Sequence, residues 1–214
     1  MRFTKNIIIL LTGVILLAAL PGCRGPKLAT ANEQFDRGEY FEAQKTYRKI
    51  YNKLTKREER PQRGVVAYQM GLCYEKLGMS ARASSAFANA IRYNYPDSTA
   101  ILKMARSLQE EGKYPQAIKA YEDYLELDPK SEVAMTGLSG CRWAVNQKGN
   151  PTRYVVRQAK LFNSRRSDFS PMFIDREAAD VIYFTTTNEK VTGEKKSEIT
   201  GMKKGDIWMS RKNE

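Results

Sequence analysis

Apolar residues recur with helical spacing from about residue 28 to residue 146, and this pattern is itself repeated along the chain. The segment Gly38-Glu39-Tyr40-Phe41-Glu42-Ala43 has a counterpart in Gly112-Lys113-Tyr114-Pro115-Gln116-Ala117, and Gly78-Met79-Ser80-Ala81-Arg82-Ala83 lies between them. The last two of these glycines are 34 residues apart and the first two are 40 apart, so six extra residues are expected in the charged stretch 56–63. The pattern predicts pairs of helices, each pair joined by a tight turn at the glycine.

Small and aromatic residues stand at fixed offsets from each turn. The turn glycines are Gly38, Gly78 and Gly112, and the small residues seven positions before them are Ala31, Gly71 and Ala105. The alanines five positions after the glycines are Ala43, Ala83 and Ala117, and the aromatic residues four positions further on are Tyr47, Phe87 and Tyr121. Small residues allow the two helices of a pair to approach closely, and the aromatic ring is expected to fill the space toward the next pair.

A helix–turn–helix unit with this period and these markers resembles the tetratricopeptide repeat. The resemblance implies a mainly α-helical solenoid over residues 28–148, with three repeats and a capping helix from about Glu132 to Asn146 that has no second helix behind it. Pro129 ends the third repeat, because proline stops the helix before it. The first repeat matches least well and is expected to serve as the N-terminal cap.

Arrays of this kind hold an extended or helical peptide on a concave face that the first helix of each repeat lines. The register places seven residues on or near that face: Phe35, Tyr68, Leu72, Lys76, Leu102, Arg106 and Gln109. Apolar, aromatic and cationic side chains together suit a protein segment with apolar and acidic residues. Half of the seven could instead pack between repeats, and no lysine–asparagine clamp for a C-terminal carboxylate is recognisable.

From about residue 149 the helical pattern gives way to strand signals. β-Branched and aromatic residues predict strands at Val181–Thr187 and Gly205–Met209, with weaker candidates at Tyr154–Val156 and Ser170–Asp175. The polar stretch 190–204 is expected to be a flexible loop between the two stronger strands.

The order of three short motifs in this region resembles one blade of a TolB-type, WD40-like β-propeller. The motifs are Phe169-Ser170-Pro171, Tyr183-Phe184-Thr185 and Asp206-Ile207-Trp208. One blade cannot close a propeller ring. Residues 149–214 are therefore expected to be a partial propeller, completed in trans by another polypeptide or left in a shortened remnant of a longer protein.

The first 23 residues have the pattern of a secretory signal. Two cations, Arg2 and Lys5, precede an apolar run from Ile7 to Leu20, and Leu20-Pro21-Gly22-Cys23 follows. The segment from Leu20 to Cys23 resembles a bacterial lipobox. The resemblance implies a signal peptide at 1–22, acylation (palmitate) of Cys23 and a short linker over 23–27. The alternative is an uncleaved N-terminal anchor helix.

The chain has a net charge of +12 and no histidine. The lack of histidine removes Ser-His-Asp and Cys-His catalysis and every His-based metal site, so we expect no enzyme, no metal and no cofactor. The positive charge suits anionic partners, although no nucleic-acid-binding motif is present and no nucleic-acid partner is expected. Cys73 and Cys141 occupy the same repeat position two repeats apart, which predicts two buried thiols too distant for a disulfide.

The order of lipobox, tetratricopeptide repeats and propeller blade resembles the N-terminal part of the OmpA-family lipoproteins of Bacteroidetes, a group linked to type IX secretion and gliding motility. The resemblance implies an anchor in outer-membrane lipid through Cys23, a periplasmic location, and a scaffold role among envelope proteins of a secretion or peptidoglycan-associated complex. Residues that would hold peptidoglycan in that family's C-terminal domain have no counterpart here. The alternative within the same setting is an accessory factor of a wall-associated enzyme.

Overall fold

The computed structural model describes residues 27–147, 149–150, 153–155, 157–158, 163–174 and 180–211. The signal peptide expected at 1–22, the lipidated Cys23 and nearly all of the 23–27 linker lie outside the described residues, as do Val156 and Asp175. Within the described residues, seven α-helices precede three β-strands. The expected fold class, a mainly helical repeat solenoid followed by a small β segment, is confirmed.

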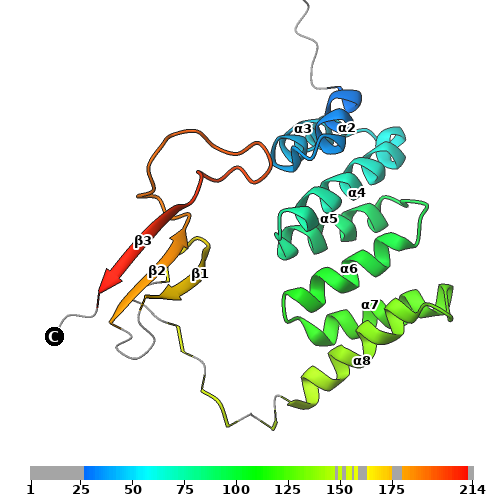
Figure 1. Ribbon diagram of the computed structural model, residues 1–214. Helices are drawn as coiled ribbons and strands as arrows, with labels where there is room; N and C mark the ends of the chain where they lie inside the picture. The colour runs from blue at the N-terminus through cyan, green and yellow to red at the C-terminus, as the bar shows by residue number, and fades with distance from the viewer. Residues whose placement is uncertain are drawn as a thin grey trace, which may run out of the picture.

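The helices form three antiparallel pairs and one terminal helix (Figure 1). The pairs are α2 (Leu28–Asp36) with α3 (Tyr40–Lys53), α4 (Arg60–Lys76) with α5 (Ser80–Arg92), and α6 (Thr99–Glu110) with α7 (Tyr114–Leu127); α8 (Glu132–Gln147) follows. The turn glycines Gly38, Gly78 and Gly112 have φ values of 79°, 66° and 74°, in the left-handed region that favours glycine. Each turn therefore reverses the chain at low conformational cost.

The six extra residues between the first two pairs form a short 3-10 helix, η1 (Arg57–Glu59), and lengthen the start of α4. Arg63, in the second turn of α4, fixes this insertion to the repeats. Its guanidinium lies 4.4 Å from the ring centre of Tyr51 and 4.9 Å from that of Tyr93. A cation held between two aromatic faces ties the first pair of helices to the second.

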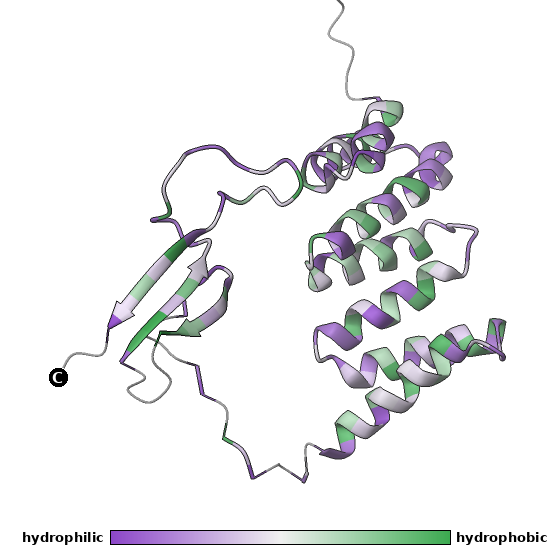
Figure 2. Cartoon of the chain, viewed as in Figure 1, coloured by the Kyte–Doolittle hydropathy of each residue, from purple (hydrophilic) through white to green (hydrophobic). Residues whose placement is uncertain are grey.

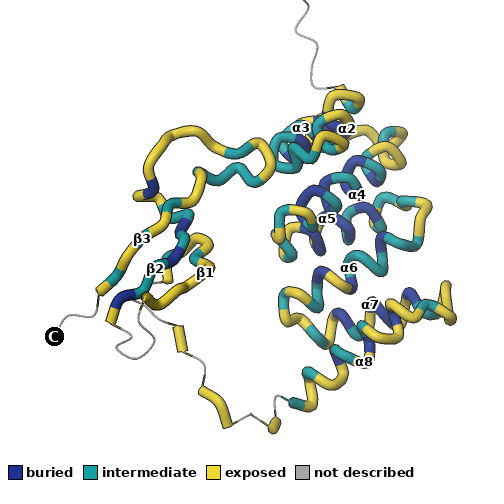
Figure 3. Tube along the Cα trace, viewed as in Figure 1, coloured by how far each residue is buried: buried dark blue, intermediate teal, exposed yellow. Residues whose placement is uncertain are grey.

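Each helix packs against the next one along the chain. Every helix of the stack carries buried residues (Figure 3), and hydrophobic and hydrophilic residues are interspersed along it (Figure 2). Ala31 and Ala105 are completely buried, as are Ala43, Ala83 and Ala117. The aromatic residues Tyr47, Phe87 and Tyr121 are among the largest fully buried side chains. The core therefore consists of large rings set against small residues, which gives close helix–helix packing.

The strands β1 (Asp168–Phe173), β2 (Val181–Thr186) and β3 (Asp206–Arg211) form an antiparallel sheet in the order β1-β2-β3. Val181 pairs with Arg211 and Thr186 with Asp206, and the β1–β2 register shifts at a bulge between Phe169 and Met172. Tyr154 and Val155 belong to no strand and are 73% and 76% exposed. The expectation of a strand there is wrong for these two residues, because strand-forming side chains need a neighbouring strand to pair with.

The connection between β2 and β3 reaches back to the first pair of helices (Figure 1). The backbone N–H of Phe41 in α3 donates a hydrogen bond of 3.1 Å to the carbonyl oxygen of Ile199. A side chain at Gly201 would overlap the Phe41 ring, so this glycine allows the loop to lie directly on the ring. The stretch expected to be a flexible loop is thus attached to the start of the solenoid; we call this contact the clasp.

Candidate peptide-binding groove

The seven residues expected on the concave face come from α2, α4 and α6 and lie in three different environments. Lys76 and Arg106 are exposed. Phe35, Leu72 and Leu102 are partly buried against the two core clusters. Tyr68 and Gln109 are held by neighbouring side chains, so the structure assigns two of the seven to packing between helices. The other five remain candidates for the concave face on the strength of the repeat register.

Tyr68 is only 9% exposed because other aromatic rings cover it. Its ring stacks on Tyr95, with centres 4.2 Å apart and planes 11° apart, and lies 5.6 Å from the Phe87 ring. Its hydroxyl lies 3.3 Å from the Thr99 hydroxyl at the start of α6. Tyr68 therefore joins the second pair of helices to the third and offers little surface to a ligand.

Gln109 serves a similar role between α6 and α7. Its Oε1 accepts a 2.6 Å hydrogen bond from the Tyr121 hydroxyl. In the first pair, the Tyr47 hydroxyl donates in the same way to Asn32 Oδ1, at 2.7 Å. Burial raises the pKa of Tyr121 to about 12, and that of Tyr47 rises for the same reason. Both tyrosines therefore stay neutral donors that align the two helices of a pair.

An ion pair that the sequence did not indicate crosses from α4 to α6. Lys103 Nζ lies 2.9 Å from Glu75 Oε2, and both side chains are about a quarter exposed. Their separation of 28 residues matches no periodic rule, although both stand on first helices of adjacent repeats. In the part of the chain that the structure describes, Lys76 and Arg106 have no carboxylate within ion-pairing distance. These two cations are thus available to an external anion.

The 34-residue period places apolar residues and free cations at equivalent positions on adjacent first helices. Leu72 and Arg106 are 34 residues apart and so occupy the same place on α4 and α6, as do Tyr68 and Leu102. A segment lying across the first helices would therefore meet an apolar side chain on one repeat and a guanidinium on the next. This arrangement can bind an acidic segment that also carries apolar residues.

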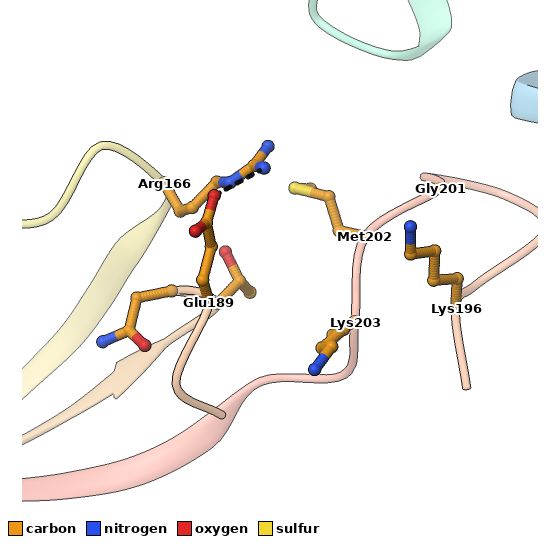
Figure 4. A pocket seen from close by; sticks show the side chains of 8 residues that line it. Arg166, Glu189, Lys196, Gly201, Met202 and Lys203 are labelled. Carbon is orange, nitrogen blue, oxygen red and sulfur yellow. Dashed lines mark hydrogen bonds and ion pairs between the residues drawn. The ribbon is translucent and has the colours of Figure 1, made fainter. Parts of the chain in front are cut away.

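A separate pocket of about 280 Å³ lies where the β2–β3 loop meets the sheet (Figure 4). Its labelled lining residues are Arg166, Glu189, Lys196, Gly201, Met202 and Lys203. Arg166 Nη2 lies 3.5 Å from Glu189 Oε1, and Lys203 Nζ lies 3.0 Å from Glu194 Oε1. Two of its three cations are thus already paired with carboxylates, so the pocket is a less suitable anion site than the exposed Lys76 and Arg106.

The two cysteines within the described residues are buried and free, as the repeat register predicts. Burial raises the pKa of Cys73 to about 12 and also raises that of Cys141. Both thiols are therefore protonated packing groups at neutral pH. Among the described residues, no three histidine, cysteine or acidic side chains gather in a way that could hold a metal ion. None of the described helices has the length and apolar character needed to cross a membrane.

Comparison with known proteins identifies the repeats. Residues 66–98 and 99–131 each match the family model of the tetratricopeptide repeat. No curated protein matches the chain. The first pair of helices lies outside both matched segments, in agreement with its weaker sequence markers.

Several solved structures resemble the helical part. The first TPR domain of human RPAP3 is 26% identical, with 58% of this chain and 93% of that chain covered and a TM-score of 0.47. The Sgt2 TPR domain from Aspergillus fumigatus is 18% identical, with 65% and 96% covered and a TM-score of 0.47. The myosin chaperone UNC-45 from C. elegans, in complex with an Hsp90 peptide, is 20% identical, with 56% of this chain but only 13% of that chain covered and a TM-score of 0.48. The two family-model matches show that the chain carries tetratricopeptide repeats, which are protein–protein interaction modules and typically non-catalytic.

Proposed function

We propose that this protein is a lipid-anchored scaffold on the periplasmic face of the outer membrane, whose repeats hold acidic segments of other envelope proteins. The observation that supports the binding role is that Lys76 and Arg106 form no ion pair with any described residue. Each stands one helical turn after a partly buried leucine, Leu72 or Leu102, on adjacent first helices. Apolar contacts supply binding energy, and the cations select acidic partners and speed their approach.

The proposed location rests on the sequence of the first 23 residues. Cleavage and acylation are supported by the cations Arg2 and Lys5, by the apolar run after them, and by the lipobox-like segment that ends at Cys23. Two or more acyl chains would give stable anchoring, and Arg24 and Lys27 would then lie near anionic lipid headgroups. The partners we propose are components of an outer-membrane complex, of the secretion or peptidoglycan-associated kind that the family resemblance implies.

The binding role is tested by crosslinking from a defined position. A photoreactive aromatic amino acid replaces Leu102, one helical turn before Arg106 on α6, in the chain within its own envelope, so that both free cations are kept. Captured proteins are identified by mass spectrometry. The matched control places the same group at Lys119, an exposed cation on α7 rather than on a first helix. We expect outer-membrane, secretion or OmpA-like proteins to be captured from position 102 alone. Equal capture from both positions would count against the groove.

The charge preference has its own test. Arg106→Glu reverses one of the free cations, whereas Lys119→Glu makes the same change of net charge outside the groove. We expect the first variant to lose the captured partner and the second to keep it. Loss in both variants would mean that net charge, and not the groove, attracts the partner.

The anchor is tested independently of the groove. Cys23→Ala removes the thiol that would be acylated, and we expect the variant to leave the membrane fraction. An unchanged distribution after fractionation would contradict lipid anchoring while leaving the binding role intact.

A further inference from the structure

The terminal helix α8 presents a face that its counterparts in the repeats keep covered. Ser139 stands 34 residues after Ala105 and is therefore the fourth member of the series of small residues. Ala31 and Ala105 are 0% exposed because the second helix of their pair lies on them, and Gly71 is buried likewise. Ser139 is exposed, because no second helix follows α8 in the described part of the chain.

Apolar groups surround Ser139 on this uncovered face. Met135 is 45% exposed and Trp143 is 64% exposed, and they flank a shallow hollow. The hollow is lined by Met135, Thr136, Ser139, Gly140 and Trp143. Figure 3 shows α8 at the free end of the stack, with much of its surface exposed. An exposed tryptophan beside small residues is typical of a helix-binding surface.

The sequence of α8 combines features of the two helices that contact each other within a repeat. Ser139 has the register of a first helix, and Ser139 with Trp143 has the small-to-aromatic spacing of four that second helices show in Ala83 with Phe87 and Ala117 with Tyr121. A second α8 can therefore supply the aromatic ring that a second helix supplies within each repeat. This continues the helix-on-helix packing by which the solenoid is already built.

The positions on α8 are symmetric about Ser139. Met135 and Trp143 each lie four residues from it, so two antiparallel α8 helices crossing at Ser139 place each Met135 against the other copy's Trp143. Thioether–aromatic contacts are favourable, and the small residues at the centre let the helices approach. Arg142 would meet Thr136, and Glu132 would meet Asn146, so no like charges oppose one another. Arg142 is also held at 2.7 Å by Glu122 of α7.

We propose that two copies of this chain associate through α8, with the helices antiparallel and a two-fold axis at Ser139. The interface is isologous, since one surface contacts itself. It leaves the groove on α4 and α6 free, so a dimer would present two grooves. Two linked grooves bind a repeated partner more tightly than one groove does.

The axis is tested by a single cysteine at its centre. In the full chain, purified in detergent, Ser139→Cys would bring two thiols within the reach of a disulfide. The control is Asp123→Cys, an exposed position on α7. We expect about tenfold more covalent dimer after mild oxidation for Ser139→Cys than for either the control or the unmodified chain, because the interface holds the two thiols at a high effective concentration.

The contact itself is tested by Trp143→Glu. Because Trp143 is largely exposed, the monomer should keep its circular dichroism spectrum and melting temperature. We expect the mass from light scattering to fall by about half, whereas Leu127→Glu, at an exposed position outside the hollow, keeps the dimer. A monomeric unmodified chain at about 100 μM, or a dimer that survives Trp143→Glu, would overturn the proposal.

Discussion

The ring of Phe87 lies so close to Gly71 that its Cε1 atom stands 2.5 Å from the position a Cβ at residue 71 would take. Gly71 is thus required by the neighbouring helix rather than by its own backbone. Gly71→Leu should overpack the contact between α4 and α5 and lower the free energy of unfolding by about 1–3 kcal/mol. Urea unfolding followed by circular dichroism measures the change. Ala81→Leu, at an exposed position of α5, is the control and should stay within about 0.5 kcal/mol of the unmodified chain.

The Tyr121 side chain contributes both a ring and a hydrogen bond. Its ring is 1% exposed, so Tyr121→Ala should leave a cavity that lowers the free energy of unfolding by about 3–5 kcal/mol. Tyr121→Phe keeps the ring and removes only the donor to Gln109, which should cost about 0.5–1.5 kcal/mol. Equal losses in the two variants would show that the ring contributes little beyond its hydroxyl.

Alkaline pH should destabilise the solenoid through its buried thiol. Burial raises the pKa of Cys73 from 9.0 to about 12, so above about pH 9 the unfolded chain loses this proton while the folded chain keeps it. The stabilisation is complete below pH 9 and is lost as the pH rises toward 12, at up to about 1.4 kcal/mol per pH unit for this group. The free energy of unfolding, measured at a series of pH values, should fall less steeply with rising pH for Cys73→Ala than for the unmodified chain. An identical slope in the two proteins would contradict this account.

Substitutions at two loop glycines separate strain from contact at the clasp. Gly193 and Gly201 have φ values of 80° and 71°, but only Gly201 lies against Phe41, and a Cβ at Gly193 would meet nothing within 4 Å. Gly193→Ala and Gly201→Ala should therefore carry a similar backbone cost of about 1–2 kcal/mol. Only Gly201→Ala should release the Phe41 amide, and hydrogen exchange at that amide should become faster. Equal exchange in both variants would mean that the clasp does not depend on this close approach.

The periodic parts of the fold could be predicted from the sequence because they depend on short-range rules. Gly38, with its left-handed φ, and Gly71, with the Phe87 ring on it, each satisfy a requirement within one pair of helices. The pairing of β2 with β3 likewise follows from two consecutive segments that are rich in β-branched and aromatic residues. Local periodicity is the strongest structural signal that a single sequence carries.

The remaining features depend on residues that no period relates. Tyr68 has the register of a groove residue. The ring of Tyr95, in the turn before α6, nevertheless stacks on the Tyr68 ring and covers it. The ion pair between Glu75 and Lys103, and the placement of Arg63 between two tyrosines, also join side chains whose separations follow no repeat. Such contacts become evident only when the helices are in place.

The clasp also bears on the order in which the molecule folds. The solenoid forms through contacts between successive helices, and such near-neighbour contacts are made rapidly. Phe41 and Ile199, by contrast, are 158 positions apart, and bringing distant segments together carries an entropic cost that grows with the length of chain between them. The loop should therefore reach α3 only after the repeats have stacked. Until that late step, the sheet would be joined to the helices by covalent connection alone, free to change its orientation relative to α3.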